Sequence, residues 1–185
     1  MTLYIKNMVC PRCIAAVSGV LNDIGAKTVQ VNLGEVILVE ELTDVQKNEL
    51  SSKLEELGFE LLDDSRKQQI EKIKSIIIHN IHYSDDIKHN FSEIIASELN
   101  KEYSQLSKLF SSIEGITIEQ YIIQQKIEKV KELLVYNEMS LSEIAYKLGY
   151  SSVAHLSAQF KKIAGFTPSQ FKAQGIRLRK PIDKL

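Results

Sequence analysis

The chain has 185 residues, of which 44% are apolar and 25% are charged, a composition typical of globular proteins. No window approaches the roughly 20 apolar residues of a membrane span, and the amino terminus lacks the pattern of a signal peptide, so we expect a cytoplasmic protein. Residues 1–65 carry 5 basic and 11 acidic side chains, whereas residues 66–185 carry 18 and 13. This change of sign predicts two modules with different partners.

The first 62 residues combine strand-like and helix-like patterns. Apolar and polar residues alternate in four short segments, and Leu33-Gly34 supplies a turn between the second and third of them. Thr43 followed by Gln46 has the spacing of a capping box at a helix start. The predicted order is β-α-β-β-α-β, with strands at 3–6, 28–32, 35–40 and 59–62, and helices from Pro11 to Leu21 and from Thr43 to Gly58.

The remainder of the chain has a helical pattern throughout. Residues 63–68 are polar and form the expected domain boundary. An apolar stripe between Ile70 and Ile81 has helical spacing and predicts the first helix. Six more helices are expected at 91–99, 102–113, 118–136, 141–148, 152–164 and 168–174. The predicted fold class is therefore α+β, with a ferredoxin-like βαββαβ domain followed by an all-α domain of seven helices.

An internal repeat divides the helical part into two similar units. When Ala96 is aligned with Ala145, each is followed by a leucine three residues later and by a turn residue, Asn100 or Gly149, four residues later. A helix ending in phenylalanine, then Gly and Thr, comes next in both. A small residue at the crossing and a residue tolerant of positive φ in the turn are what a helix-turn-helix requires. The repeat therefore predicts two helix-turn-helix motifs.

The second helix of each unit offers polar side chains suited to a major groove. Lysine neutralises phosphates, while Gln, Ser and Tyr can bond base edges. The joining helix, 118–136, is about 28 Å long at 1.5 Å per residue, close to the roughly 34 Å between successive major grooves on one face of DNA. One chain can thus contact two grooves, and we expect a monomer or weak dimer. The expected DNA-binding residues are Tyr103, Ser104, Gln105, Ser107, Lys108, Ser151, Ser152, His155, Lys161 and Lys162.

These motifs carry a family resemblance. Residues 68–172 resemble the DNA-binding domain of AraC-type transcriptional regulators, most specifically in residues 127–134, 140–150 and 160–168. The resemblance implies a DNA-binding domain over 68–175, with promoter DNA as the partner, and leaves a basic tail at 176–185. One departure is Ala158, where the family often has an arginine. Lys108 occupies the matching position in the first unit, which is therefore the expected site of sequence recognition.

Two cysteines lie between the first strand and the first helix. Cys10-Pro11-Arg12-Cys13, preceded by Met8, forms an MxCxxC motif in a βαββαβ unit, and residues 1–63 resemble the heavy-metal-associated domain of copper chaperones and metal-pumping ATPases. Two thiolates at this spacing suit Cu(I) or another soft metal ion. We also expect the helix amino terminus to lower the pKa of the thiols.

The resemblance extends to the residues around the cysteines. In the family, the residue matching Met8 points inward, and an aromatic residue matching Phe59 packs near the metal site. The family usually has glycine where this chain has Asn7.

Other functions of the cysteine module stay open. A CxxC pair also serves thiol-disulfide chemistry, although the strand order is not thioredoxin-like, and the module could serve only protein contacts. A thiol-disulfide enzyme or metal carrier with an incidental helical domain is the remaining alternative. The sequence has no Gly-rich phosphate loop, no HExxH motif and no obvious Ser-His-Asp arrangement, so we expect no enzyme. The leading hypothesis is a DNA-binding regulator that responds to a soft metal ion.

Overall fold

The computed structural model describes residues 1–62, 65–84, 90–174 and 182. The chain divides into two compact units, Met1–Ile76 and Ile77–Leu185. Within the described ranges, no helix has the length and apolar character needed to cross a membrane.

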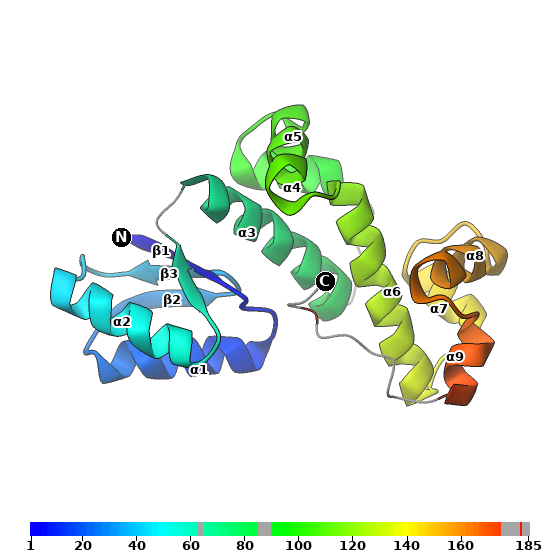
Figure 1. The fold of residues 1–185 in the computed structure, drawn as a ribbon, viewed down its shortest axis with the longest axis horizontal. Helices are drawn as coiled ribbons and strands as arrows, with labels where there is room; N and C mark the ends of the chain where they lie inside the picture. The colour runs from blue at the N-terminus through cyan, green and yellow to red at the C-terminus, as the bar shows by residue number, and fades with distance from the viewer. Residues whose placement is uncertain (63–64, 85–89, 175–181, 183–185) are drawn as a thin grey trace. The chain divides into compact units, whose positions relative to one another are not determined.

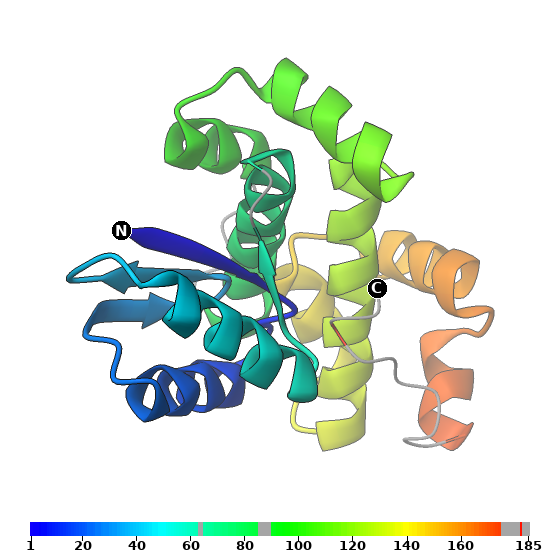
Figure 2. The ribbon, with the colours of Figure 1, turned by 60° about the vertical axis from the view of Figure 1, so that its left-hand side comes forward.

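The amino-terminal unit is built on a four-stranded antiparallel sheet with the strand order β2-β3-β1-β4. Its elements follow one another along the chain in the order β1, α1, β2, β3, α2, β4. The apolar side chains of the inner strand β1, Leu3 and Ile5, lie in the core, and the two helices α1 and α2 cover one face of the sheet (Figure 2). The elements are β1 Thr2–Lys6, α1 Pro11–Asp23, β2 Thr28–Asn32, β3 Glu35–Leu38, α2 Asp44–Glu56 and β4 Glu60–Leu62. The predicted capping box of Thr43 and Gln46 is present at the start of α2.

Helix α3, Ser65–Ile78, continues from this sheet, and most of it belongs to the amino-terminal unit. Lys72 bonds Glu35 of β3 at 2.8 Å, and both side chains are largely covered. Gly34 has a φ of 74°, which favours glycine, and a Cβ atom there would lie 2.5 Å from Ser75 Oγ, so a larger residue would displace this hydroxyl. The border between the units at Ile76 therefore lies later than the polar segment 63–68 that the sequence analysis takes as the boundary, because α3 packs on the sheet.

Seven α-helices follow the sheet within the described residues, as predicted (Figure 1). The first ends at Ile78 rather than Ile81, because the chain changes there to a π-helical turn, η1. The longest, α6, contacts α5 near its start and α7, α8 and α9 further along. The elements are η1 His79–Tyr83, α4 Phe91–Leu99, α5 Tyr103–Glu114, α6 Ile118–Tyr136, α7 Leu141–Lys147, α8 Val153–Ala164 and α9 Pro168–Gln174.

The predicted repeat is present in three dimensions. Asn100 is the C-cap residue of α4, Gly149 is the second residue after α7, and both have positive φ. Gly115 and Gly165 are the C-cap residues of α5 and α8, and they also have positive φ. In both units a buried phenylalanine packs against an aromatic ring of the following helix, with 5.7 Å between ring centroids: Phe110 with Tyr121, and Phe160 with Phe171. The two units thus share their core as well as their sequence pattern.

The two turns differ in length by one residue. The backbone N–H of Lys101 bonds the carbonyl of Ala96, and the N–H of Tyr150 bonds the carbonyl of Ala145, so both turns begin in the same way. The next helix is capped by the following residue, Glu102, in the first unit. In the second unit Ser151 is inserted before the cap at Ser152. Helix α8 therefore starts after a longer turn than α5 does.

Ala145 is the residue whose size should matter most for the second unit. It is 3% exposed on α7, which packs against α8. Ala145→Leu forces extra methyl groups into this contact, and we expect a loss of about 1–3 kcal/mol in the free energy of unfolding. Ala173→Leu, on the exposed face of α9, is the control and should change stability by less than about 0.5 kcal/mol. Urea unfolding measures both, and equal stabilities for the two variants would contradict the packing argument.

Candidate nucleic-acid interface and thiol pair

The first recognition helix, α5, exposes most of the residues expected to bind DNA. Ser104, Gln105 and Lys108 are exposed, and Ser107 is half-buried. Tyr103, the first residue of the helix, is instead engaged within the protein, since its hydroxyl donates to Glu119 Oε1 of α6 at 2.5 Å. This hydrogen bond lowers the pKa of Glu119, while burial and the nearby carboxylate raise the pKa of Tyr103. Tyr103 therefore fastens α5 to α6.

The second recognition helix, α8, exposes its predicted residues at both ends. Ser152 caps the helix by accepting the N–H of His155 at 3.0 Å, and Ser151 Oγ lies 3.0 Å from His155 Nδ1. Lys161 and Lys162 are exposed in the last turn, where their positive charges complement the helix dipole. Residues 151–158, from the turn to the middle of α8, include no lysine or arginine.

The equivalent positions of the two helices carry different chemistry. Lys108 and Ala158 are matched by the repeat, and both are exposed, so the difference between them lies at the surface. The hydrogen bond between Tyr103 and Glu119 has no equivalent in the second unit, because the matching residues are Val153 and Ser169. The two recognition helices are alike in backbone and core but different in the groups they present.

Two residues that hold the second unit together were not predicted from the sequence. Lys126 of α6 donates to the carbonyl of Leu148 at 2.7 Å, and its Nζ lies 5.6 Å from the ring centroid of Tyr150. Burial lowers the pKa of Lys126 and raises that of Tyr150. The sequence shows a lysine in α6 and a tyrosine in the turn before α8, but nothing in it indicates that they meet. A charged helix residue such as Lys126 is usually exposed to solvent.

The two cysteines lie together at the start of α1. Cys10 is the N-cap residue, and the N–H of Cys13 bonds its carbonyl at 2.9 Å. The two Sγ atoms are 3.3 Å apart, and both cysteines are free. A disulfide requires about 2.05 Å between the sulfurs, whereas two thiolates on one tetrahedral ion with metal–sulfur bonds of about 2.3 Å are about 3.8 Å apart. The sulfurs are therefore too far apart for a disulfide and closer together than two thiolates on one tetrahedral ion.

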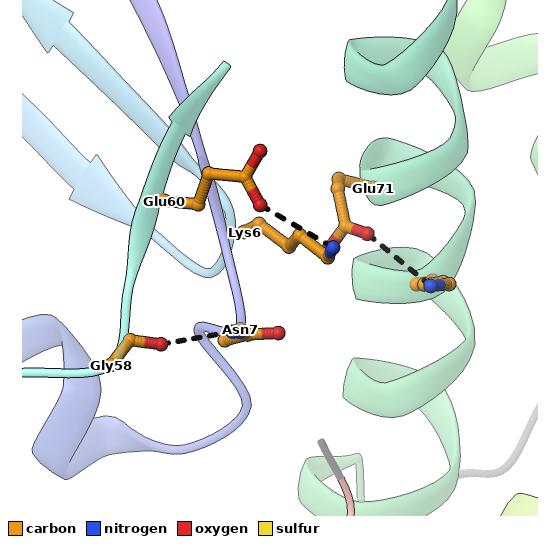
Figure 3. Close-up of polar contacts among 6 residues, drawn as sticks. Lys6, Asn7, Gly58, Glu60 and Glu71 are labelled. Carbon is orange, nitrogen blue, oxygen red and sulfur yellow. Dashed lines mark hydrogen bonds and ion pairs between the residues drawn. The ribbon is translucent and has the colours of Figure 1, made fainter. Parts of the chain in front are cut away.

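The chain before Cys10 is fixed by its neighbours. Asn7 has a φ of 71°, a conformation that asparagine tolerates better than most residues, which explains how it serves where the resembling family has glycine. Its side chain donates to the carbonyl of Gly58 at 2.9 Å, and the adjacent Lys6 bonds Glu60 at 3.4 Å (Figure 3). Met8 is 2% exposed, and it shares the core with Phe59, as expected.

The expectation of a lowered thiol pKa is wrong for Cys13. Its side chain is partly covered by the core, and burial raises the pKa of the thiol above its ordinary value. The hydrogen bond from the Val9 backbone acts in the opposite direction but is the smaller effect. Removal of the thiol from water, which disfavours the thiolate, is the largest of the effects on this pKa.

Histidines do not complete a metal site in the described part of the chain. His79 is exposed, whereas His82 is buried and lies 2.9 Å from Gln125 through Nε2. His89 lies outside the described residues, as do all of the predicted basic tail 176–185 except Ile182. Where the structure describes the chain, it holds no group of three or more His, Cys, Asp or Glu side chains that could bind one ion.

Comparison with known proteins supports the repeat. A family model described as a helix-turn-helix domain matches residues 95–174. An HTH-type transcriptional regulator from the cgkA 5′ region of Pseudoalteromonas carrageenovora is 30% identical over 127 residues, which are 65% of this chain and 73% of that protein. The Msm operon regulatory protein of Streptococcus mutans is 28% identical over 152 residues, 80% of this chain and 51% of that protein. The chain spans about half or less of the length of several such relatives.

Solved structures agree with this assignment. The C-terminal domain of AraT, a response regulator from Geobacillus stearothermophilus, superposes with a TM-score of 0.51 and 25% identity, covering 64% of this chain and 95% of that domain. An AraC-type DNA-binding protein from Chromobacterium violaceum, 22% identical, shares the fold with a TM-score of 0.52 over 58% of this chain and 92% of its own. The chain belongs to the helix-turn-helix transcriptional regulators of the AraC type.

Proposed function

We propose that this protein binds promoter DNA in a sequence-specific way by placing α5 and α8 in successive major grooves. The observation that carries the proposal is the structural repeat, in which two recognition helices with the same pattern of exposed and buried positions are joined by α6. Helix α6 has 19 residues and is therefore about 28 Å long, close to the spacing of two grooves on one face of DNA.

The exposed side chains divide into two groups by chemistry. Ser104, Gln105 and Lys108 on α5 can donate to base edges, and lysine pairs well with the O6 and N7 atoms of guanine. Further hydroxyl and imidazole groups that can form hydrogen bonds come from Ser107 on α5 and from Ser151, Ser152 and His155 around the start of α8. Lys161 and Lys162 form the basic end of α8 and suit phosphate oxygens. Tyr103 contributes by fixing the start of α5.

Lys108→Ala tests the role of the first recognition helix. A preferred site is first isolated by selection from random double-stranded DNA with the wild-type chain. The variant should lose about 1–3 kcal/mol of binding free energy on that site, with a relaxed base preference at one position. Fluorescence anisotropy at several salt concentrations measures the affinity.

Lys27→Ala is the matched control, because Lys27 is an exposed lysine of the amino-terminal unit paired with Glu40. It should bind like wild type. An equal loss on every sequence for Lys108→Ala would show that Lys108 contacts only phosphate.

We further propose that residues 1–63 are a heavy-metal-associated, ferredoxin-like domain that binds a soft ion such as Cu(I) through Cys10 and Cys13. Its support is the strand order of the sheet, the sulfur pair at 3.3 Å and the braced loop before it. Two thiolates suit a soft ion of low coordination number better than Zn²⁺, which takes four protein ligands in structural sites. The bound ion would link the two sulfurs, and the response would be a changed affinity for DNA.

An anaerobic binding assay with and without Cu(I) tests this response. The affinity of the wild-type chain for its selected site should change at least fivefold when Cu(I) is supplied, the lower end of usual coupling energies. Cys10→Ser combined with Cys13→Ser should remove the change and keep the affinity of the metal-free protein. Identical affinities with and without Cu(I) in the wild type would refute metal response and leave DNA binding intact.

The raised pKa of Cys13 predicts a dependence on pH. Because the thiolate is the reactive and metal-binding form, alkylation of Cys13 by iodoacetamide should be slow at pH 7 and accelerate as the pH rises above the ordinary thiol range. Peptide mapping by mass spectrometry resolves Cys13 from Cys10. A rate that is already at its maximum at pH 7 would show that the thiol is ionised there.

A further inference from the structure

Tyr150 lies in the turn before α8 and contacts two polar side chains of that helix. Its hydroxyl donates to Gln159 Oε1 at 2.7 Å, and its ring meets that of His155 edge-on, with 5.4 Å between centroids. His155 and Gln159 are four residues apart and therefore lie on the same face of the helix. A single tyrosine thus constrains two side chains of one face.

Tyr150 is itself held in place. Its backbone N–H bonds the carbonyl of Ala145 at 2.9 Å, and the ammonium group of Lys126 lies over its ring. Lys126 also bonds the preceding turn at Leu148. A tyrosine hydroxyl is protonated in the neutral range and can donate, and burial raises the pKa of Tyr150 further.

The hydrogen bond orients the amide group of Gln159. Oε1 accepts from Tyr150 and keeps one lone pair, whereas both N–H donors of the amide nitrogen are left for a ligand. Guanine offers two acceptors, O6 and N7, in the major groove, whereas the bidentate contact of Gln with adenine needs both halves of the amide. A Gln159 held in this way favours guanine.

We propose that Tyr150, supported by Lys126, is a positioning residue that orients Gln159 to donate to a guanine in the DNA site of the second unit. This inference rests on the proposed DNA binding. It gives α8 a means of base recognition that Ala158 does not supply. The first unit has no equivalent, because Lys101 and Leu109 occupy the positions of Tyr150 and Gln159.

Selection from random double-stranded DNA by the full chain, followed by sequencing, tests the proposal. Tyr150→Phe keeps the ring and removes the hydroxyl. It should lower the preference for guanine at one position of the second half-site about tenfold, the size of one good base contact, without changing the first half-site. Tyr146→Phe is the matched control, since Tyr146 lies on the adjacent helix α7 with 87% of its surface exposed. It should select the wild-type sequence.

Gln159→Glu gives an independent test. A carboxylate can still accept from Tyr150, but it replaces the two donors with an acceptor, so the preferred base should change from guanine to cytosine, whose N4 donates. An unchanged preference in either variant, or an equal loss at both half-sites, would overturn the positioning role while leaving DNA binding established. If the wild type enriches no sequence, the proposed function itself fails. Thermal unfolding identifies a variant that does not fold, in which case the other variant decides.

Discussion

The geometry of the DNA-binding unit depends on the packing of α6 against both helix-turn-helix motifs. A helix in contact with α5, α7, α8 and α9 buries side chains around much of its circumference, and these include Gln125, Glu128 and Lys131. Charges in such a place are tolerated only when they are paired, and Glu128 bonds Lys131 at 2.5 Å, one turn along the helix. The length and direction of α6 then determine the distance between the recognition helices. No second chain is needed to set that distance.

The two helix-turn-helix units share their helix caps and their buried aromatic pairs, whereas the exposed residues of α5 and α8 differ. Thr117 and Thr167 both accept the N–H of a glutamine three residues later, at the starts of α6 and α9. These caps and the buried aromatic pairs stabilise each unit without using the outward face of its recognition helix. The surface positions can therefore hold Lys108 in one unit and Ala158 in the other without disturbing the core.

Most of the elements could be predicted from the sequence because short-range rules determine them. Periodicity identified the seven helices, and turn residues such as Asn100 and Gly149 identified their ends. The border between the units was misplaced because ion pairs such as Lys72 with Glu35 join segments far apart in the chain, and no local pattern reveals them. The pKa of Cys13 was misjudged for a similar reason. The helix terminus is visible in the sequence, whereas the core that covers the thiol forms only on folding. The contacts of Tyr103 and Tyr150 likewise depend on tertiary structure.

The extra residue in the second turn has a consequence for how such a protein lies on a genome. Ser151 makes the two motifs unequal in backbone as well as in surface chemistry. A symmetric dimer binds a palindrome and is unchanged when the site is inverted. A single chain with two unequal recognition helices matches a sequence in one orientation only. Bound to such a site, the protein would have one defined orientation along the DNA. Inverting the site would reverse that orientation, so the surfaces that face upstream would then face downstream.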